Sequence, residues 1–326
     1  MSEADVCVIM PTWNRANYLG FAIDSIGRQT ADVRIELIVA DDASTDNTWE
    51  VIREYTSRWA HRLTIQHLLL PKGGVCVARN KALASSSAPL VTFLDSDDVW
   101  EDTKLACQLP LLSDRVGLVH SDFRYIDTLG HFSDKGGQRP DNPARGKCLT
   151  AMLAEDTVVF STVLVRRKWI DAAAASEPHG LPFDLKWVNG EDYDLLLRIA
   201  RFTDFGYVSR PLAQYRVHEH QTGMSDLARV FRYHCQVQMA FVDRWGTQLG
   251  LDSTAGRDAA QAFLLSRCES LYWQRNLEIV RKLCALATEL GFNDPRFQML
   301  KRRASRPRWL LSAKDTWDKI WTPART

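Results

Sequence analysis

The sequence has almost no excess of charge, because its 326 residues include 41 lysines and arginines against 40 aspartates and glutamates. This balance gives no overall electrostatic case for nucleic-acid binding. Its seven cysteines are odd in number and form no C-x-x-C pair, which argues against a disulfide framework and a zinc site. The sequence shows no signal-peptide pattern and no apolar run long enough to span a bilayer. We therefore expect a cytoplasmic, reduced protein that does not bind nucleic acid.

Short apolar runs alternate with amphipathic segments through the first hundred residues. The runs at 6–10, 35–40, 63–70 and 90–94 have the length of buried strands, and apolar residues recur at helical spacing between them. This alternation predicts an α/β fold with a parallel sheet. Further strands are expected at 116–120 and 158–165, a helix at 191–201, and an all-helical appendage with helices at 225–245, 257–273 and 276–290.

Polar side chains gather where the predicted strands end. Those that follow the first, second and fourth strands are Thr12, Asn14, Arg15, Asp41, Asp42, Asp95, Asp97 and Asp98. Ligands of parallel α/β sheets bind beyond the carboxyl ends of the strands. We therefore expect these residues to share one rim of the sheet.

Asp95-Ser96-Asp97 is a D-x-D motif at the end of a buried strand. Two carboxylates one residue apart can share a divalent cation and, through it, a diphosphate. The motif is not specific alone, because Asp192-Tyr193-Asp194 repeats it and a turn or a helix cap would explain a lone instance. A place at a rigid strand tip favours a ligand role for Asp95 and Asp97.

Five sequence elements occur in a characteristic order: Pro11-Thr12-Trp13-Asn14-Arg15, Asp41–Asp46, Gly73-Gly74 with Ala78-Arg79-Asn80, Phe93–Asp98, and Glu191-Asp192. Together they resemble the family 2 glycosyltransferases, which adopt the Rossmann-like GT-A fold with a mixed, mainly parallel sheet and flanking helices. The resemblance covers roughly residues 5–220. It implies a GT-A domain at 1–222, with a nucleotide-sugar half at 1–115 and an acceptor half at 116–222, followed by a helical region at 223–326.

The resemblance also implies an activity. Such enzymes invert the anomeric centre and need Mn²⁺ or Mg²⁺. They move a sugar from a nucleotide-sugar, here a UDP-sugar by resemblance alone, to a hydroxyl of a glycan or lipid-linked glycan. By this resemblance, Thr12, Asn14 and Arg15 lie against the nucleotide, and Asp41 and Asp42 lie near its base and ribose. Arg79 matches a residue that reaches the base or the phosphate. Asp95 and Asp97 match the D-x-D motif, with Asp97 as the direct metal ligand, and Asp192 matches the general base.

Two assignments have plain structural alternatives. Asp192 would take a proton from the acceptor hydroxyl, yet its place at a helix start also suits an N-cap or a first-turn charge. His218 follows a predicted strand, and similar positions in the family reach the diphosphate or the metal. A surface histidine explains His218 equally well.

The C-terminal tail at 301–326 is strongly basic, with eight basic and two acidic residues. Trp309, Trp317 and Trp321 share one helical face, and basic residues enrich the rest. A basic helix with tryptophans on its apolar side can lie on an anionic membrane surface, which would place the enzyme peripherally on the inner face of the membrane. The alternative is that the tryptophans pack on the helical region.

Two other functions stay open. A sugar nucleotidyltransferase also handles nucleotide, metal and sugar phosphate, but it usually carries a glycine-rich loop after the first strand, and Pro11–Arg15 contains no glycine. A non-catalytic module that binds nucleotide or glycan would have no need for a general base. The presence of Asp192 together with the strand-tip aspartates favours the enzyme.

Overall fold

The computed structural model describes residues 4–133, 142–219 and 226–305. The chain divides into two compact units, Met1–Ser225 and Asp226–Thr326. The tail tryptophans, predicted as a membrane-facing surface, lie outside the described residues. Among the helices that are described, none is both long and apolar enough to cross a membrane.

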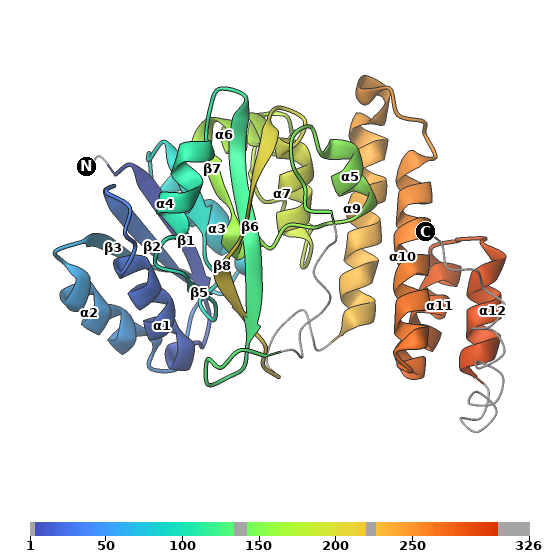
Figure 1. The fold of residues 1–326 in the computed structure, drawn as a ribbon, viewed down its shortest axis with the longest axis horizontal. Helices are drawn as coiled ribbons and strands as arrows, with labels where there is room; N and C mark the ends of the chain where they lie inside the picture. The colour runs from blue at the N-terminus through green and yellow to red at the C-terminus, as the bar shows by residue number, and fades with distance from the viewer. Residues whose placement is uncertain (1–3, 134–141, 220–225, 306–326) are drawn as a thin grey trace. The chain divides into compact units, whose positions relative to one another are not determined.

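The first unit is built on one mixed eight-stranded sheet (Figure 1). In spatial order its strands are β3 (Leu63–Leu69), β2 (Ile35–Asp41), β1 (Val6–Thr12), β4 (Leu90–Phe93), β7 (Leu164–Arg166), β6 (Val116–Ile126), β8 (Asp204–Arg216) and β5 (Val99–Trp100). The first four strands are parallel, β7 is antiparallel to both of its neighbours, and β5 is antiparallel to β8. The predicted α/β fold with a mixed sheet is confirmed.

The winding of the sheet reverses between β1 and β4, since β2 and β3 lie on one side of β1 and β4 on the other. Thr12 pairs with Asp41 at the ends of β1 and β2, and Ile9 pairs with Phe93 near the end of β4. The three carboxyl ends therefore meet at one edge of the sheet. Such a topological switch point is where open α/β sheets bind their ligands.

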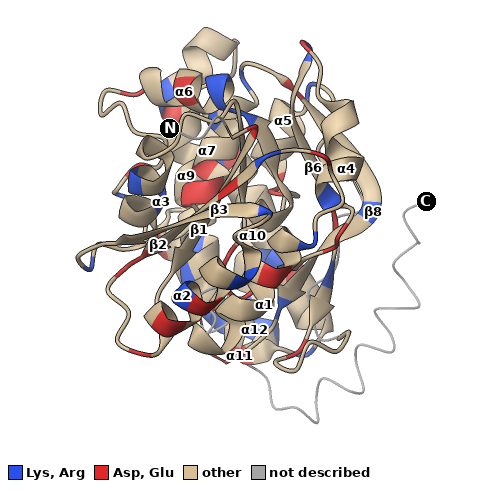
Figure 2. Cartoon of the chain, turned by 90° about the vertical axis from the view of Figure 1, so that its left-hand side faces the viewer, with Lys and Arg blue, Asp and Glu red and all other residues tan. Residues whose placement is uncertain are grey.

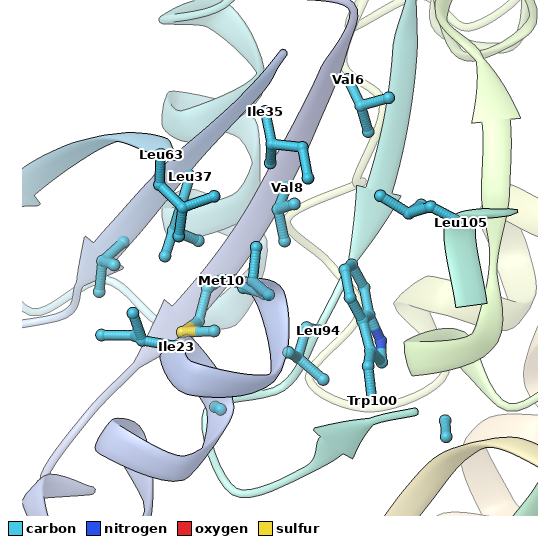
Figure 3. Close-up of a cluster of buried hydrophobic side chains, with 14 of the residues drawn as sticks. Val6, Val8, Met10, Ile23, Ile35, Leu37, Leu63, Leu94, Trp100 and Leu105 are labelled. Atoms are coloured by element: carbon cyan, nitrogen blue, oxygen red, sulfur yellow. The ribbon is translucent and has the colours of Figure 1, made fainter. Parts of the chain in front are cut away.

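Helices and short turns cover the sheet: α1 (Ala16–Gly27), α2 (Thr48–Trp59), α3 (Val75–Ala84), α4 (Lys104–Gln108), α5 (Leu149–Ala154), α6 (Arg167–Ala175), α7 (Glu191–Ile199) and the 3₁₀ turns η1 (Leu109–Leu111) and η2 (Phe160–Thr162). Side chains alternate between the two faces of a strand, so Val6, Val8 and Met10 of β1 point to the same face. They pack there with Ile23 of α1 and Leu37 of β2 in the main apolar core (Figure 3).

The strand predicted at 158–165 is largely wrong. Only Leu164–Arg166 forms a strand, and the residues before it form η2. Thr162 Oγ1 donates to Val159 O at 2.6 Å, and Ser161 Oγ donates to Asp98 at 2.6 Å. The Thr162 bond is local and competes with strand pairing, whereas the Ser161 bond joins η2 to the loop after β4.

The second unit is entirely helical within its described residues. Its helices are α9 (Leu227–Leu249), α10 (Ala255–Trp273), α11 (Leu277–Glu289) and α12 (Pro295–Ala304). The three predicted helices are confirmed as α9–α11, and α12 was not predicted. Its start carries a clear signal, because Asp294 caps the Arg296 N–H at 2.9 Å and proline occupies the first turn. Apolar residues such as Leu264, Leu283 and Leu286 fill the core between these helices.

Candidate active site

Two aspartates end β2, and both are buried. Asp41 Oδ1 accepts from the Ser44 N–H at 2.9 Å, and His67 Nε2 lies 3.3 Å from its Oδ2. Asp42 accepts from the Gly73 N–H at 2.6 Å and pairs with Lys72 at 3.0 Å. Asp42 thus holds the loop that leads into α3, while Asp41 lies at the rim beside the end of β1.

The loop after β1 is tied to the loop after β2. The Asn14 N–H donates to Ser44 Oγ at 2.9 Å, and Asn14 Oδ1 accepts from the Thr45 N–H at 2.7 Å. Asn14 adopts a φ of 53°, in a region that asparagine tolerates better than most residues. Thr12 Oγ1 is buried without a hydrogen-bond partner in the part of the chain that the structure describes. An orphaned hydroxyl at a strand tip suits a site that a ligand completes.

The structure brings three predicted residues together at the D-x-D motif. Arg15 Nε lies 3.2 Å from Asp97 Oδ2, and His218 Nε2 lies 3.0 Å from the same oxygen. Burial would raise the pKa of Asp97, but the His218 hydrogen bond and the Arg15 charge outweigh it and lower that pKa. Burial raises the pKa of Asp95, and the neighbouring Asp97 charge adds to this effect. Asp97 is therefore the more firmly ionised of the two.

The third aspartate of this loop is structural. Asp98 is buried, accepts from Ser161 Oγ at 2.6 Å, and accepts from the Arg216 N–H at 3.0 Å. Arg216 also donates from Nε to the carbonyl oxygen of Asp97 at 2.8 Å. These contacts fix the loop to η2 and to the end of β8, so Asp97 is held on a firm base. The sequence placed Asp98 on the rim with the other strand-end aspartates but did not predict this structural role for it, and it predicted none for Arg216.

The donor set around Asp97 fits the predicted divalent ion. A carboxylate and an imidazole suit Mn²⁺, and carboxylates suit Mg²⁺. Within residues 4–133, 142–219 and 226–305, no group of three or more His, Cys, Asp or Glu side chains is arranged to hold a metal. An ion here would take its other ligands from water or substrate, as is usual for magnesium bound with phosphates.

Asp192 lies in the first turn of α7, directly after Gly190, which adopts a φ of 80°. Its Oδ1 accepts from the Tyr193 N–H at 2.8 Å, and it forms no ion pair with any described residue. Tyr193 is buried and its hydroxyl donates to Met152 O at 2.7 Å, which ties α7 to the end of α5. The Asp192 carboxylate thus lies at the start of α7, and none of the described basic side chains forms an ion pair with it.

Arg79, which was predicted to contact base or phosphate, is bonded to two carboxylates in the structure. Its buried guanidinium donates from Nη1 to Glu191 Oε1 at 2.6 Å and from Nη2 to Asp95 Oδ1 at 2.9 Å. It therefore links the D-x-D strand tip to the start of α7. Nucleotide contact by Arg79 stays a prediction.

Two carboxyl groups near Asp192 were missed as functional candidates. Burial, with the Asp192 charge next, raises the pKa of Glu191 to about 7 and that of Asp156 to about 8. Glu191 directly precedes Asp192, the predicted general base. The Glu-Asp pair in the sequence could have indicated it as a functional residue. Asp156 follows α5, and nothing in its sequence context separates it from an ordinary loop aspartate.

In the view of Figure 2, acidic and basic residues are interspersed over the first unit. A topological switch point in a mainly parallel sheet, a D-x-D motif and an acidic helix start joined to that motif fit the GT-A fold. The family model described as Glycosyl transferase family 2 matches residues 7–171, half of the chain. The protein therefore belongs to glycosyl transferase family 2.

Individual relatives agree with this membership. The chain is 25% identical over 281 residues to a hyaluronan synthase of Pasteurella multocida, covering 85% of the chain but only 27% of that protein. It thus spans about a quarter of that relative's length. It is 28% identical over 205 residues to the Escherichia coli UDP-Glc:alpha-D-GlcNAc-diphosphoundecaprenol beta-1,3-glucosyltransferase WfgD, covering 62% of the chain and 72% of WfgD.

A solved structure shares the fold. S. aureus TarS 1-349 in complex with UDP-GlcNAc superposes with a TM-score of 0.60 at 17% sequence identity, over 96% of this chain and 88% of that one. At this identity the likeness establishes the fold, and the site is argued from the residues themselves.

Proposed function

We propose that this glycosyltransferase moves a sugar from a UDP-sugar to a hydroxyl of a glycan or lipid-linked glycan, with inversion and with Asp192 as general base. One observation carries the proposal: Arg79 joins Asp95 of the D-x-D motif to Glu191, the neighbour of Asp192. This link supports placing the D-x-D motif and the Asp192 carboxylate, at the start of α7, in one site.

The donor would lie across the carboxyl ends of β1, β2 and β4. The Asp41 carboxylate can accept a hydrogen bond from an N–H of the base, and Thr12 Oγ1 can form one with the base or the ribose. Trp13 is half exposed at this rim, and the Lys72 ammonium lies 3.3 Å from its ring centroid. An exposed indole offers a surface on which a base can stack. The names of WfgD and of the TarS complex, both with uridine donors, support UDP.

Asp97, with Asp95 and His218 beside it, would hold Mn²⁺ or Mg²⁺ against the diphosphate. When bound, such an ion neutralises charge on the departing nucleoside diphosphate. The lowered pKa of Asp97 keeps its carboxylate ionised for this purpose. Arg15, already beside Asp97, adds a positive charge that suits a diphosphate.

Asp192 would remove the proton of the acceptor hydroxyl as that oxygen attacks C1 of the donor sugar. The new bond joins C1 to the acceptor oxygen, the bond from C1 to the diphosphate oxygen breaks, and the proton stays on Asp192. Attack from the face opposite the diphosphate inverts the anomeric centre. WfgD is named for a lipid-linked diphosphate acceptor, which supports that acceptor class here.

Calorimetric titration tests the donor site. UDP, GDP, CDP and dTDP are titrated, with Mn²⁺ or with EDTA, into the wild type and Asp97→Asn. Asp102→Asn is the matched control, because Asp102 is an exposed aspartate whose carboxylate pairs with Arg28. We expect UDP to bind tightly, and only with both metal and Asp97. No metal-dependent binding of any nucleotide would favour the binding module. Pyrophosphate release in product analysis would favour the nucleotidyltransferase.

We further propose that the basic tail contacts an anionic membrane. Residues 301–305 complete the region around α12, where Ala304 is buried in the core and its carbonyl oxygen accepts from Arg281 at 2.7 Å. A variant that ends at Ser305 therefore keeps α12 and removes the tail tryptophans. It should sediment less with anionic vesicles than the full chain, and equal sedimentation would contradict the proposal.

A further inference from the structure

Arg79 is a nearly enclosed cation of the site, with a side chain only 4% exposed. Its two acidic partners come from distant parts of the chain, 16 and 112 residues away. Its guanidinium carbon lies 4.9 Å from the Phe160 ring centroid and 5.5 Å from that of Phe183. The two rings shield the guanidinium from water and restrict its orientation.

Only arginine can make this connection. The planar guanidinium presents several N–H groups in fixed directions, so one side chain can donate to two carboxylates at once. Lysine has one compact ammonium on a flexible stem, and it would favour one carboxylate over the other. Breaking a buried pair also leaves a charge without compensation, which makes alternative arrangements costly. The Arg79 contacts therefore fix the distance between the end of β4 and the start of α7.

We propose that Arg79 is a positioning residue that sets the start of α7, and with it Asp192, relative to the D-x-D motif, so that binding of the diphosphate at the motif orders the general base. The inference rests on the proposed function. It assigns Arg79 a role through Asp95 and Glu191 instead of the direct contact with base or phosphate that the family resemblance implies.

One feature favours direct contact instead. Arg79 Nε is buried and has no hydrogen-bond partner among the described residues, so a substrate oxygen that came within reach would complete its hydrogen bonding. The two roles predict different measurements. Loss of a direct phosphate contact would weaken UDP–Mn²⁺ binding at least about 10-fold. Loss of positioning would leave that affinity within about threefold and lower the rate of transfer.

The first test measures amide hydrogen exchange with and without UDP and Mn²⁺. In the wild type, ligand should slow exchange both in 94–98 and in the first turns of α7, where the Asp194 N–H donates to Gly190 O. In Arg79→Lys and Arg79→Met, ligand should still protect 94–98 but no longer α7. Arg198→Lys is the matched control, because Arg198 is a buried arginine of α7 that pairs with Asp194 at 2.7 Å on the same helix. It should keep the protection of α7.

Protection of α7 that survives in both Arg79 variants would overturn the positioning role while leaving the donor site intact. Failure of the wild type to bind UDP–Mn²⁺ would instead overturn the proposed function, and with it the role of Arg79. The two failures are therefore distinguishable. Thermal unfolding of each variant shows whether the fold is kept, and Arg79→Lys retains the charge should Arg79→Met not fold.

The second test separates kcat from KM. Arg79→Lys should lower kcat about 100-fold with KM for the donor nearly unchanged, as expected for a general base that is misplaced. Glu191→Gln should lower kcat similarly, and the double variant should be no worse than Arg79→Lys alone, because both changes break one link. A raised KM with unchanged kcat, or additive losses, would overturn the proposal.

Discussion

The two units of this protein differ sharply in what they bury. The first unit encloses many polar and charged side chains, among them Arg79, Asp98, Lys104, Glu191 and Arg198. Within the described residues of the second unit, the buried side chains are apolar or aromatic except that of Gln238. Buried charges cost free energy unless each has a partner, whereas buried apolar groups stabilise directly. The buried charges of the first unit, several of which belong to its site, therefore lower the stability of that unit. The second unit is stabilised mainly by its apolar core.

Two ion pairs of the same spacing show the difference. Arg198 and Asp194 lie four residues apart on α7 at 2.7 Å, with side chains 1% and 14% exposed. Lys282 and Glu278 lie four residues apart on α11 at 3.0 Å, with side chains 61% and 71% exposed. Both pairs join positions i and i+4 of one helix, but Arg198 also donates to the carbonyl oxygens of Ala173 and Pro182. The pairs differ most in burial, which is therefore expected to dominate the difference in their effects on substitution.

The largest effect is expected on catalysis, in the first unit. Asp192→Asn keeps the size of the side chain but cannot accept the acceptor's proton, so the rate of transfer should fall about 1,000-fold while UDP–Mn²⁺ affinity changes little. Assays of transfer and calorimetric titration check this. Asp171→Asn is the matched control, because Asp171 is exposed on α6. Transfer above a tenth of the wild-type rate would remove Asp192 from the role of general base.

The next largest effect is on stability. Asp194→Asn leaves the Arg198 charge buried and unpaired, so the free energy of unfolding of the first unit should fall by about 3–5 kcal/mol. Urea unfolding followed by circular dichroism measures it. Below the unfolding transition, transfer should stay close to the wild-type rate, since Asp194 pairs with Arg198 and lies outside the proposed machinery. A loss under about 1 kcal/mol would mean that the pair is solvated and that the comparison is wrong.

The pH dependence of stability gives a smaller effect of the same origin. Burial and the Asp192 charge raise the pKa of Asp156 from 3.8 to about 8. The Asp156 carboxyl group therefore loses its proton near pH 4 in the unfolded chain but only near pH 8 in the folded chain. Its contribution to the free energy of unfolding is complete below pH 4 and is lost as pH rises to 8. The melting temperature of the wild type should fall relative to that of Asp156→Asn between pH 5 and 8. Parallel curves would show that Asp156 titrates normally.

The fold was largely predictable because its signals are local. Strand length, helical spacing and strand-tip aspartates such as Asp41 and Asp95 can each be recognised from a short segment of sequence. The segment at 158–165 misled because its apolar composition is typical of a strand, while the hydroxyls of Ser161 and Thr162 bond elsewhere. The missed α12 had a local signal in Asp294 and the proline after it.

The connections within the site were less predictable. Sequence order places Arg79 and Glu191 on different elements, but no local pattern indicates that the two side chains meet across 112 residues. The raised pKa of Asp156 likewise depends on burial and on Asp192, 36 positions further along. Residue types and strand ends predict which groups are present, whereas their pairing depends on tertiary packing.

The smallest expected effect is on the exposed ion pair of α11, and it gives the most direct test of the difference between the two units. Glu278→Gln removes the acidic partner of the exposed pair on α11 and leaves Lys282 in water, where its charge needs no partner. Because exposed pairs gain little over solvated ions, the melting temperature should change by less than about 1 °C, and added salt should abolish even that change. Calorimetry of this variant beside Asp194→Asn gives the contrast in one experiment. A large loss from Glu278→Gln would mean that spacing, and not burial, determines the contribution of such a pair.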